Sequence, residues 1–218
     1  YLDVDAVENP EMEISANSFA SEFLQPKNLV VQNLRSAGVK GPNELDEFGI
    51  YGLSLKLGLS YKAVCWGLFS NKLIDYARTK SFSQITPKRI KESLLGDVRL
   101  AKYLSDVWRI DPSKHSTIYG SHEDVIKLEL KENSSTGHVW DYSELSNDFE
   151  IISEIRESLG KGYGDEQLLK IVARNTTPGA VTASVYQKRQ WKSKIEDRFE
   201  VSGVFEENRA GLSENLRR

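Results

Sequence analysis

The chain has one cysteine, Cys65, and one methionine among its 218 residues. A single cysteine excludes an intrachain disulfide and favours a reducing compartment, which predicts a cytoplasmic protein. No apolar run approaches the roughly 20 residues that cross a bilayer, so no membrane partner is expected. The sequence also lacks the P-loop, the G-x-S-x-G motif and the Cys-x-x-Cys motif, which excludes the enzyme classes that these motifs define.

An excess of charge of one sign is missing as well. Lys and Arg number 29 against 32 Asp and Glu, and the resulting formal charge of −3 excludes a general attraction to nucleic acid. The three histidines, His115, His122 and His138, form no H-E-x-x-H pair. A catalytic zinc site needs about three protein ligands, so this chain alone is expected to be inactive as a zinc enzyme.

Residues 11 to about 110 are predicted to be mostly helical, because their apolar side chains recur at helical spacing. The stretch from Met12 is interrupted at Pro26 and continues to Gly38. Further helical stretches are expected over residues 45–57, 61–69 and 87–108.

Two of these helices, joined by a turn around Gly58, form a pair of helix-turn-helix type, with Ser60 as the N-cap of the second. That second helix carries one cation, Lys62, among mostly apolar residues. Reading of DNA bases needs several polar or basic side chains, so a packing role is favoured over DNA recognition.

After Pro112 the period changes, and residues 125–131 alternate apolar and charged side chains as a half-buried strand does. Later β-branched or aromatic segments at 168–173, 180–186 and 199–205 are separated by turn residues. The pattern predicts a β-sandwich of immunoglobulin type. The expected fold class is therefore α+β and multidomain, with a helical part over 1–112, a sandwich over 113–210 and a flexible tail over 211–218.

The pattern Glu13-x-x-Ala16-Asn17-x-Phe19-Ala20, closed by Leu24-x-Pro26, resembles the ImmA/IrrE family of zinc metallopeptidases. The resemblance implies that Glu13 is the third ligand of a Zn²⁺ ion. The H-E-x-x-H helix would lie upstream, so the chain is expected to be the C-terminal part of a longer protein, and zinc would bind to the full-length protein only. The implied partners are a repressor-like protein substrate, the upstream part of the same protein, and DNA if a further N-terminal domain binds it.

Three loop patterns in the sandwich region resemble, in order, the chagasin family of inhibitors of papain-type cysteine peptidases. They are L-x-L-x-E-N-S-S-T-G-H-V-W over 128–140, G-K-G-Y-G over 160–164, and R-Q-W over 189–191. The resemblance implies protein-binding loops with the following residues: Asn133, Thr136, Gly137, Gly162, Gly164, Arg189 and Trp191. Ser134 and Gln190 stand where the family has proline, and His138 stands where it has an aromatic residue.

The leading interpretation is that the chain is part of an intracellular zinc metallo-endopeptidase that cleaves a repressor-like protein to control gene expression, with a protein-binding sandwich. One alternative is a cysteine-peptidase inhibitor or docking module without catalysis, and another is a DNA-binding regulator. Trp140 is expected in the core, because large aromatic residues dominate sandwich cores. For Trp191 a core position and an exposed binding position are both open.

Overall fold

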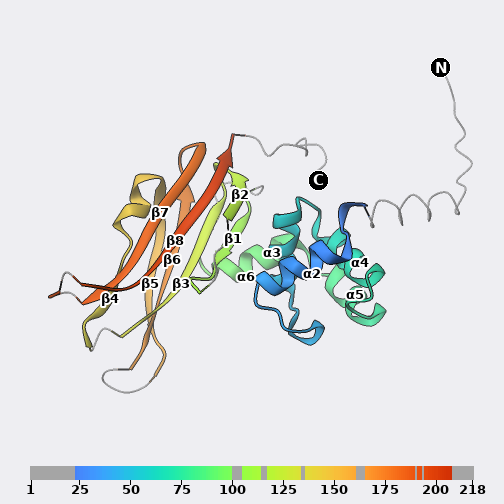
Figure 1. The fold of residues 1–218 in the computed structure, drawn as a ribbon, viewed down its shortest axis with the longest axis horizontal. Helices are drawn as coiled ribbons and strands as arrows, with labels where there is room; N and C mark the ends of the chain where they lie inside the picture. The colour runs from blue at the N-terminus through green and yellow to red at the C-terminus, as the bar shows by residue number, and fades with distance from the viewer. Residues whose placement is uncertain are drawn as a thin grey trace, which may run out of the picture. The chain divides into compact units, whose positions relative to one another are not determined.

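The computed structural model describes residues 23–99, 105–113, 117–133, 136–160, 165–189, 191–192 and 194–207. Contacts divide the chain between Pro87 and Lys88 into two compact units. The described part of the first unit is helical, and that of the second consists mainly of two β-sheets (Figure 1). The prediction of a mixed α+β chain is confirmed. Glu13 and the predicted tail at 211–218 lie outside the described residues.

The helical unit begins at the break that Pro26 makes in the chain. Proline fixes its own backbone and disfavours helix in the residue before it, so helix α2 starts directly after Pro26. The elements that follow in this unit are α2 (Lys27–Ser36), η1 (Pro42–Glu44), α3 (Glu47–Leu57), α4 (Tyr61–Ser70) and α5 (Tyr76–Ser83).

Side-chain caps begin helices α3 and α4, and a glycine ends α3. The Asp46 carboxylate accepts a hydrogen bond from the Gly49 backbone N–H at 2.7 Å at the start of α3. Helix α3 ends at Gly58, whose φ of 66° is a conformation that glycine adopts without strain. The Ser60 hydroxyl accepts from the backbone N–H of Ala63 at 3.2 Å, which confirms the predicted N-cap of α4.

Helix α4 supplies much of the interior of this unit. Its Val64, Cys65 and Leu68 are fully buried, and burial raises the pKa of the Cys65 thiol to about 11. Cys65 therefore behaves as a small buried hydrophobe rather than as a thiolate nucleophile. Gln25 packs on the same helix, with its side-chain amide donating to the Ala63 carbonyl at 3.0 Å.

The predicted helix over 87–108 is wrong at the described residues 96–99 and 105–108. Helix α6 (Pro87–Leu95) ends before Gly96, which has a φ of 61°. Trp108 lies in strand β1 (Val107–Ile110), so the sheet part of the chain begins before the expected boundary at 112/113. The four residues of β1 are too few to show the alternation typical of a strand. Val107 and Trp108 are apolar and fit the helical spacing of the preceding residues, so the sequence predicts helix there.

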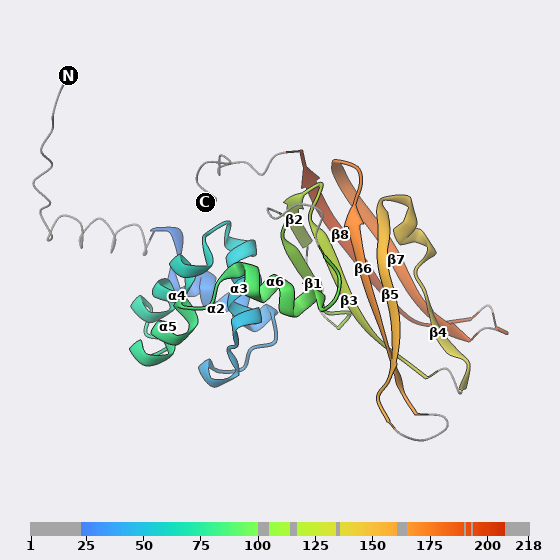
Figure 2. The same ribbon diagram turned by 180° about the vertical axis from the view of Figure 1, so that it is seen from behind.

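The second unit contains two four-stranded sheets that face each other (Figures 1 and 2). The first has the order β1-β3-β6-β5, with the further strands β3 (Val125–Glu132), β6 (Gln167–Asn175) and β5 (Phe149–Ser158). The second has the order β2-β8-β7-β4, with strands β2 (Thr117–Ser121), β8 (Ile195–Glu206), β7 (Gly179–Arg189) and β4 (His138–Asp141). Pairs β1–β3 and β2–β8 are parallel, and the other pairs are antiparallel.

The sandwich core is apolar, and the carboxylate of Asp124 is buried at one edge of it. Phe149 and Phe205 meet edge to face between the sheets, with ring centroids 5.6 Å apart. Asp124 is almost fully buried, and burial raises its pKa. It accepts hydrogen bonds from the Ser121 backbone N–H and the Trp108 indole N–H, both at 3.0 Å. This carboxylate ties β1 to the turn between β2 and β3.

Gly120 has no room for a side chain beside this carboxylate. A Cβ at Gly120 would lie 2.8 Å from an Asp124 carboxylate oxygen and 3.1 Å from the Trp108 indole nitrogen. We expect Gly120→Ala to displace the carboxylate from its donors and to lower the free energy of unfolding by about 2 kcal/mol. Gly52→Ala, within α3 and with open space around the new Cβ, should instead stabilise by roughly 0.5–1 kcal/mol. Urea denaturation measures both, and an unchanged midpoint for Gly120→Ala would contradict the account of Asp124.

Candidate binding surface

In the first sheet, two of the three predicted loops leave the sandwich at the same end. Glu132, at the end of β3, and Ser158, at the end of β5, are both paired with Gln167 at the start of β6. The β3–β4 and β5–β6 connections therefore lie at one end of that sheet (Figure 1). We call this the loop end of the sandwich, and its described residues are 133, 136–137, 159–160, 165–166, 191–192 and 194.

The second sheet brings the third loop to the same place. His138 at the start of β4 is paired with Arg189 at the end of β7, and Lys188 is paired with Ile195 at the start of β8. A short bridge between Asn133 and His138 continues β3 into β4, so the β7–β8 connection joins the loop end. Three connections that are far apart in sequence thus leave the sandwich together.

Glu132 holds the two sheets together beneath the loops. Its carboxylate is buried, with 1% of the residue exposed. One oxygen accepts from the Trp140 backbone N–H of β4 at 3.0 Å, and the other accepts from Arg156 Nε of β5 at 2.9 Å. The Trp140 indole N–H donates to the Lys131 carbonyl at 2.8 Å, which adds a second tie between β3 and β4. As predicted, Trp140 is buried.

Trp191 is exposed over 64% of its surface at the tip of the β7–β8 connection. Its ring lies against the backbone of Gly137 in the β3–β4 connection. A Cβ at Gly137 would be only 2.2 Å from the ring, and Gly137 has a φ of 78°, so this position requires glycine for two separate reasons. The two loops consequently form one surface with an aromatic ring upon it.

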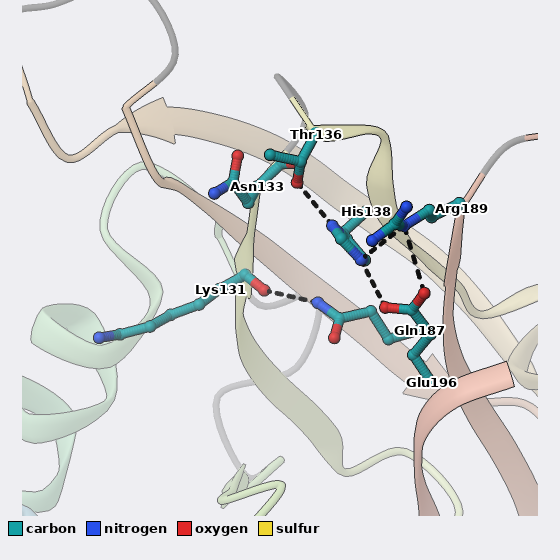
Figure 3. Close-up of polar contacts among 7 residues, drawn as sticks. All are labelled: Lys131, Asn133, Thr136, His138, Gln187, Arg189 and Glu196. Atoms are coloured by element: carbon teal, nitrogen blue, oxygen red, sulfur yellow. Dashed lines mark hydrogen bonds and ion pairs between the residues drawn. The ribbon is translucent and has the colours of Figure 1, made fainter.

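A polar cluster contains Thr136 of the β3–β4 connection, His138 of β4, Arg189 of β7 and Glu196 of β8 (Figure 3). The His138 ring has Thr136 Oγ1 2.6 Å from its Nδ1, while its Nε2 contacts a carboxylate oxygen of Glu196. Arg189 Nε lies 3.1 Å from His138 Nε2 and 3.2 Å from the other Glu196 oxygen. Across the sheets, the Gln187 side-chain amide donates to the Lys131 carbonyl at 3.4 Å.

The structure places five of the predicted loop residues together: Asn133, Thr136, Gly137, Arg189 and Trp191. Gly162, Gly164, Ser134 and Gln190 lie outside the described residues. Sequence reasoning missed the supporting roles of Glu132, His138 and Glu196. Glu132 and His138 stand within the first quoted motif, whereas Glu196 follows His138 by 58 residues and had no signal in the sequence.

An ion pair lies further along β4. The Lys188 ammonium donates to the Asp141 carboxylate at 2.5 Å and is the main cause that lowers the Asp141 pKa to about 2. Within the described ranges, no group of three His, Cys, Asp or Glu side chains is arranged to hold a metal ion. None of the helices described has both the length and the apolar character to cross a membrane.

No protein-family model matches the sequence, and no curated protein matches it. Among solved structures, similarity is found to the cysteine protease inhibitor EhICP2 from Entamoeba histolytica, with 20% identity, coverage of 46% of this chain and 94% of that chain, and a TM-score of 0.40. Amebosin is 16% identical over 47% of this chain and 98% of its own, with a TM-score of 0.34. PbICP-C, in its complex with falcipain-2, is 12% identical over 51% and 96%, with a TM-score of 0.31. Similarity at this level assigns no family to the chain.

The role of Glu132 can be separated from that of a neighbouring acid. Glu132→Ala leaves the Trp140 N–H without its acceptor and removes a buried charge partner of Arg156, so we expect a loss of roughly 3 kcal/mol in the free energy of unfolding. Glu154 also contacts Arg156, but its side chain is 35% exposed. Glu154→Ala is the matched control and should cost less than about 1 kcal/mol. Equal losses for the two variants in urea denaturation would contradict the proposed tie between the sheets.

Proposed function

We propose that the sandwich is a protein-binding module without catalytic activity, and that its loop end inserts into a cleft on a partner protein. The observation that carries this proposal is the exposed ring of Trp191, which lies on Gly137 where two loops meet. An exposed indole on a preformed backbone surface has the character of an interface anchor, because tryptophan is enriched among residues that dominate binding energy.

The motif resemblance suggests which partner to test. Asn133, Thr136, Gly137, Arg189 and Trp191 match residues of the chagasin pattern, and that family inhibits papain-type cysteine peptidases. We therefore propose a papain-type peptidase as the first candidate partner, with docking to another cleft-bearing protein as the second.

Binding to such a partner is expected to be weak. Ser134 and Gln190 stand where the resemblance has prolines, and a chain without proline has more backbone conformations to lose. Ordering the two loops on association has a free-energy cost that subtracts from affinity. The supports at Glu132 and Gly137 reduce this cost only for the part of the loops that they hold.

The anchor role of Trp191 predicts a change in affinity without a change in stability. Trp191→Ala should weaken binding to an active-site-blocked papain-type peptidase about 30-fold, which corresponds to about 2 kcal/mol. The matched control is Tyr119→Ala, because Tyr119 is 65% exposed on β2 and is paired with Val204, far along β8 from the loop end. It should bind as the unmodified chain does. Calorimetry and thermal melting check both quantities, and a large fall in melting temperature for Trp191→Ala would refute the anchor role.

A second candidate function rests on the sequence around Glu13, which lies outside the described residues. The resemblance to ImmA/IrrE peptidases supports a zinc-dependent cleavage of a repressor-like protein, in which Glu13 and an upstream H-E-x-x-H helix hold the metal. Zinc would then activate a bound water for attack on a peptide bond. DNA binding through a further upstream domain belongs to the same proposal.

Zinc content tests this second proposal. In a chain extended by its natural upstream residues, we expect about one zinc per protein, and Glu13→Gln should lower that content because a catalytic site has about three protein ligands. The matched control is Glu22→Gln, a nearby acid outside the motif, which should leave the content unchanged. Zinc content is measured by atomic absorption. Equal content in the unmodified extended chain and in the two variants would contradict the metal-ligand role of Glu13.

A further inference from the structure

Three aromatic side chains lie together on the surface of the helical unit. Trp66 and Phe69 are in α4, and Tyr76 is the first residue of α5. Their ring centroids are 6.2, 6.1 and 6.0 Å apart, so each ring contacts the other two. The three residues are 38%, 38% and 56% exposed. We call them the aromatic patch. Contiguous exposed apolar side chains mark interaction sites, whereas scattered ones need no explanation.

Each ring of the aromatic patch has an exposed lysine beside it. Lys62 lies one helical turn before the tryptophan, so the two side chains share a face of α4. Lys80 lies one turn after the tyrosine and shares its face of α5 in the same way. Lys72, which follows the end of α4, lines a surface pocket together with the phenylalanine. The apolar patch therefore has a positively charged rim.

Little negative charge balances these lysines. Residues 61–83, which contain α4 and α5, have four cations against one acid, Asp75. The Asp75 carboxylate is the N-cap of α5 and accepts from the Arg78 backbone N–H at 2.8 Å. An occupant of the aromatic patch is therefore expected to be both apolar and acidic, because its charges would then complement those of the rim.

Lys72 has a backbone conformation for which the chain elsewhere uses glycine. Its φ is 57°, and within the described ranges it is the one residue other than glycine with a positive φ. The positive-φ residues that follow helices α2, α3 and α6 are Gly38, Gly58 and Gly96. A side chain is strained in this conformation, and strain of this kind is found mainly at functional sites. The lysine side chain at the rim of the patch thus has a use that glycine would not serve.

The N-terminal sequence of the chain has the composition that the aromatic patch fits. Residues 1–11 read Y-L-D-V-D-A-V-E-N-P-E and contain four acids and five apolar or aromatic side chains. The chain has no Lys or Arg before Lys27, so these acids have no cation close to them in the sequence. We call residues 1–11 the acidic segment.

The described chain begins beside the helix that carries two of the rings. The Gln25 side-chain amide donates to the Ala63 carbonyl at 3.0 Å, and the Gln25 carbonyl accepts from the Asn71 side-chain amide at 3.0 Å. Residues 12–22 connect this point to the acidic segment, and eleven residues can span at most about 40 Å. A helix with its side chains is about 10–12 Å across. The acidic segment can therefore reach any face of α4.

We propose that the acidic segment docks on the aromatic patch of the same chain, with its apolar side chains on the rings and its carboxylates beside the three lysines. Attachment through residues 12–22 gives the segment a high effective concentration at the patch, so even a weak contact is populated. The charged rim favours this occupant over a neutral one. The contact belongs to the helical unit and depends neither on binding by the loop end nor on zinc.

A spin label tests this contact in the chain of 218 residues. Ala6→Cys places the label in the acidic segment, because the natural Cys65 is fully buried and burial raises the pKa of its thiol. The NMR signal of the Trp66 indole N–H, assigned by its loss in Trp66→Phe, should be broadened by the label and should recover when the label is reduced. An ionic strength of about 1 M should restore part of the signal without reduction, because salt screens exposed charges.

Two sets of variants and a matched control locate the contact. Substitution of the three patch lysines by Gln should reduce the broadening several-fold. Removal of the opposite charges should do the same, so a folding defect in one set does not decide the result: Asp3→Asn, Asp5→Asn, Glu8→Gln and Glu11→Gln. The control removes the same positive charge from exposed residues outside α4 and α5 and should retain the broadening: Lys27→Gln, Arg35→Gln and Lys40→Gln.

Three results would overturn the inference. The first is a Trp66 signal that the label leaves unchanged in the otherwise unmodified chain. The second is an equal loss of broadening in the patch variant and in its control, because total charge rather than the patch would then hold the segment. The third is full broadening of an unlabelled chain by a labelled chain mixed with it, because the segment would then dock on another copy.

Discussion

The loop end depends on the buried carboxylate of Glu132. Its two oxygens bond to β4 in one sheet and to β5 in the other, at the level where three connections leave the sandwich. A buried charge is costly unless its hydrogen bonds are complete, and here each oxygen has a donor. The geometry is therefore specific, because a shift of β4 along β3 would leave one carboxylate oxygen without its donor and the Trp140 N–H without its acceptor. Glu132 thus favours one position of β4 relative to β3 at the start of the loops.

Next to Glu132, the surface of the loop end is formed by Gly137 and the ring of Trp191. Gly137 has no side chain that would clash with Trp191, and the indole ring lies against its backbone. This arrangement leaves most of the Trp191 ring exposed in the free protein. The exposed apolar surface contributes nothing to folding, but it remains available for burial against a partner. In the proposed binding role, affinity would depend on how well the Trp191 connection is ordered before binding, because ordering on association subtracts from the free energy gained. The contacts among His138, Arg189 and Glu196 hold the strand ends on either side of that connection.

Local chemistry made part of this predictable. The break at Pro26, the cap at Ser60 and the alternation of residues 125–131 each depend on one or a few neighbouring residues, and each was read correctly from the sequence. The motif over 128–140 located the first loop for the same reason. The sequence did not predict β1, because four residues carry no period, and the contact of His138 with Glu196 had no signal because chain topology alone brings together residues that are 58 apart. The placement of Trp191 depended on the same long-range arrangement, so the sequence left its core and exposed positions open.

His138 joins the strand ends around the Trp191 connection through polar contacts. Its Nδ1 lies 2.6 Å from Thr136 Oγ1 in the β3–β4 connection, and its Nε2 contacts Glu196 near the start of β8. Arg189 Nε, at the end of β7, donates to the same Nε2 at 3.1 Å. Hydrogen bonds depend on direction as well as distance, so these contacts restrict the positions of the β7 and β8 ends relative to β4 more than apolar contact alone would. The cluster therefore holds the two strand ends between which Trp191 lies.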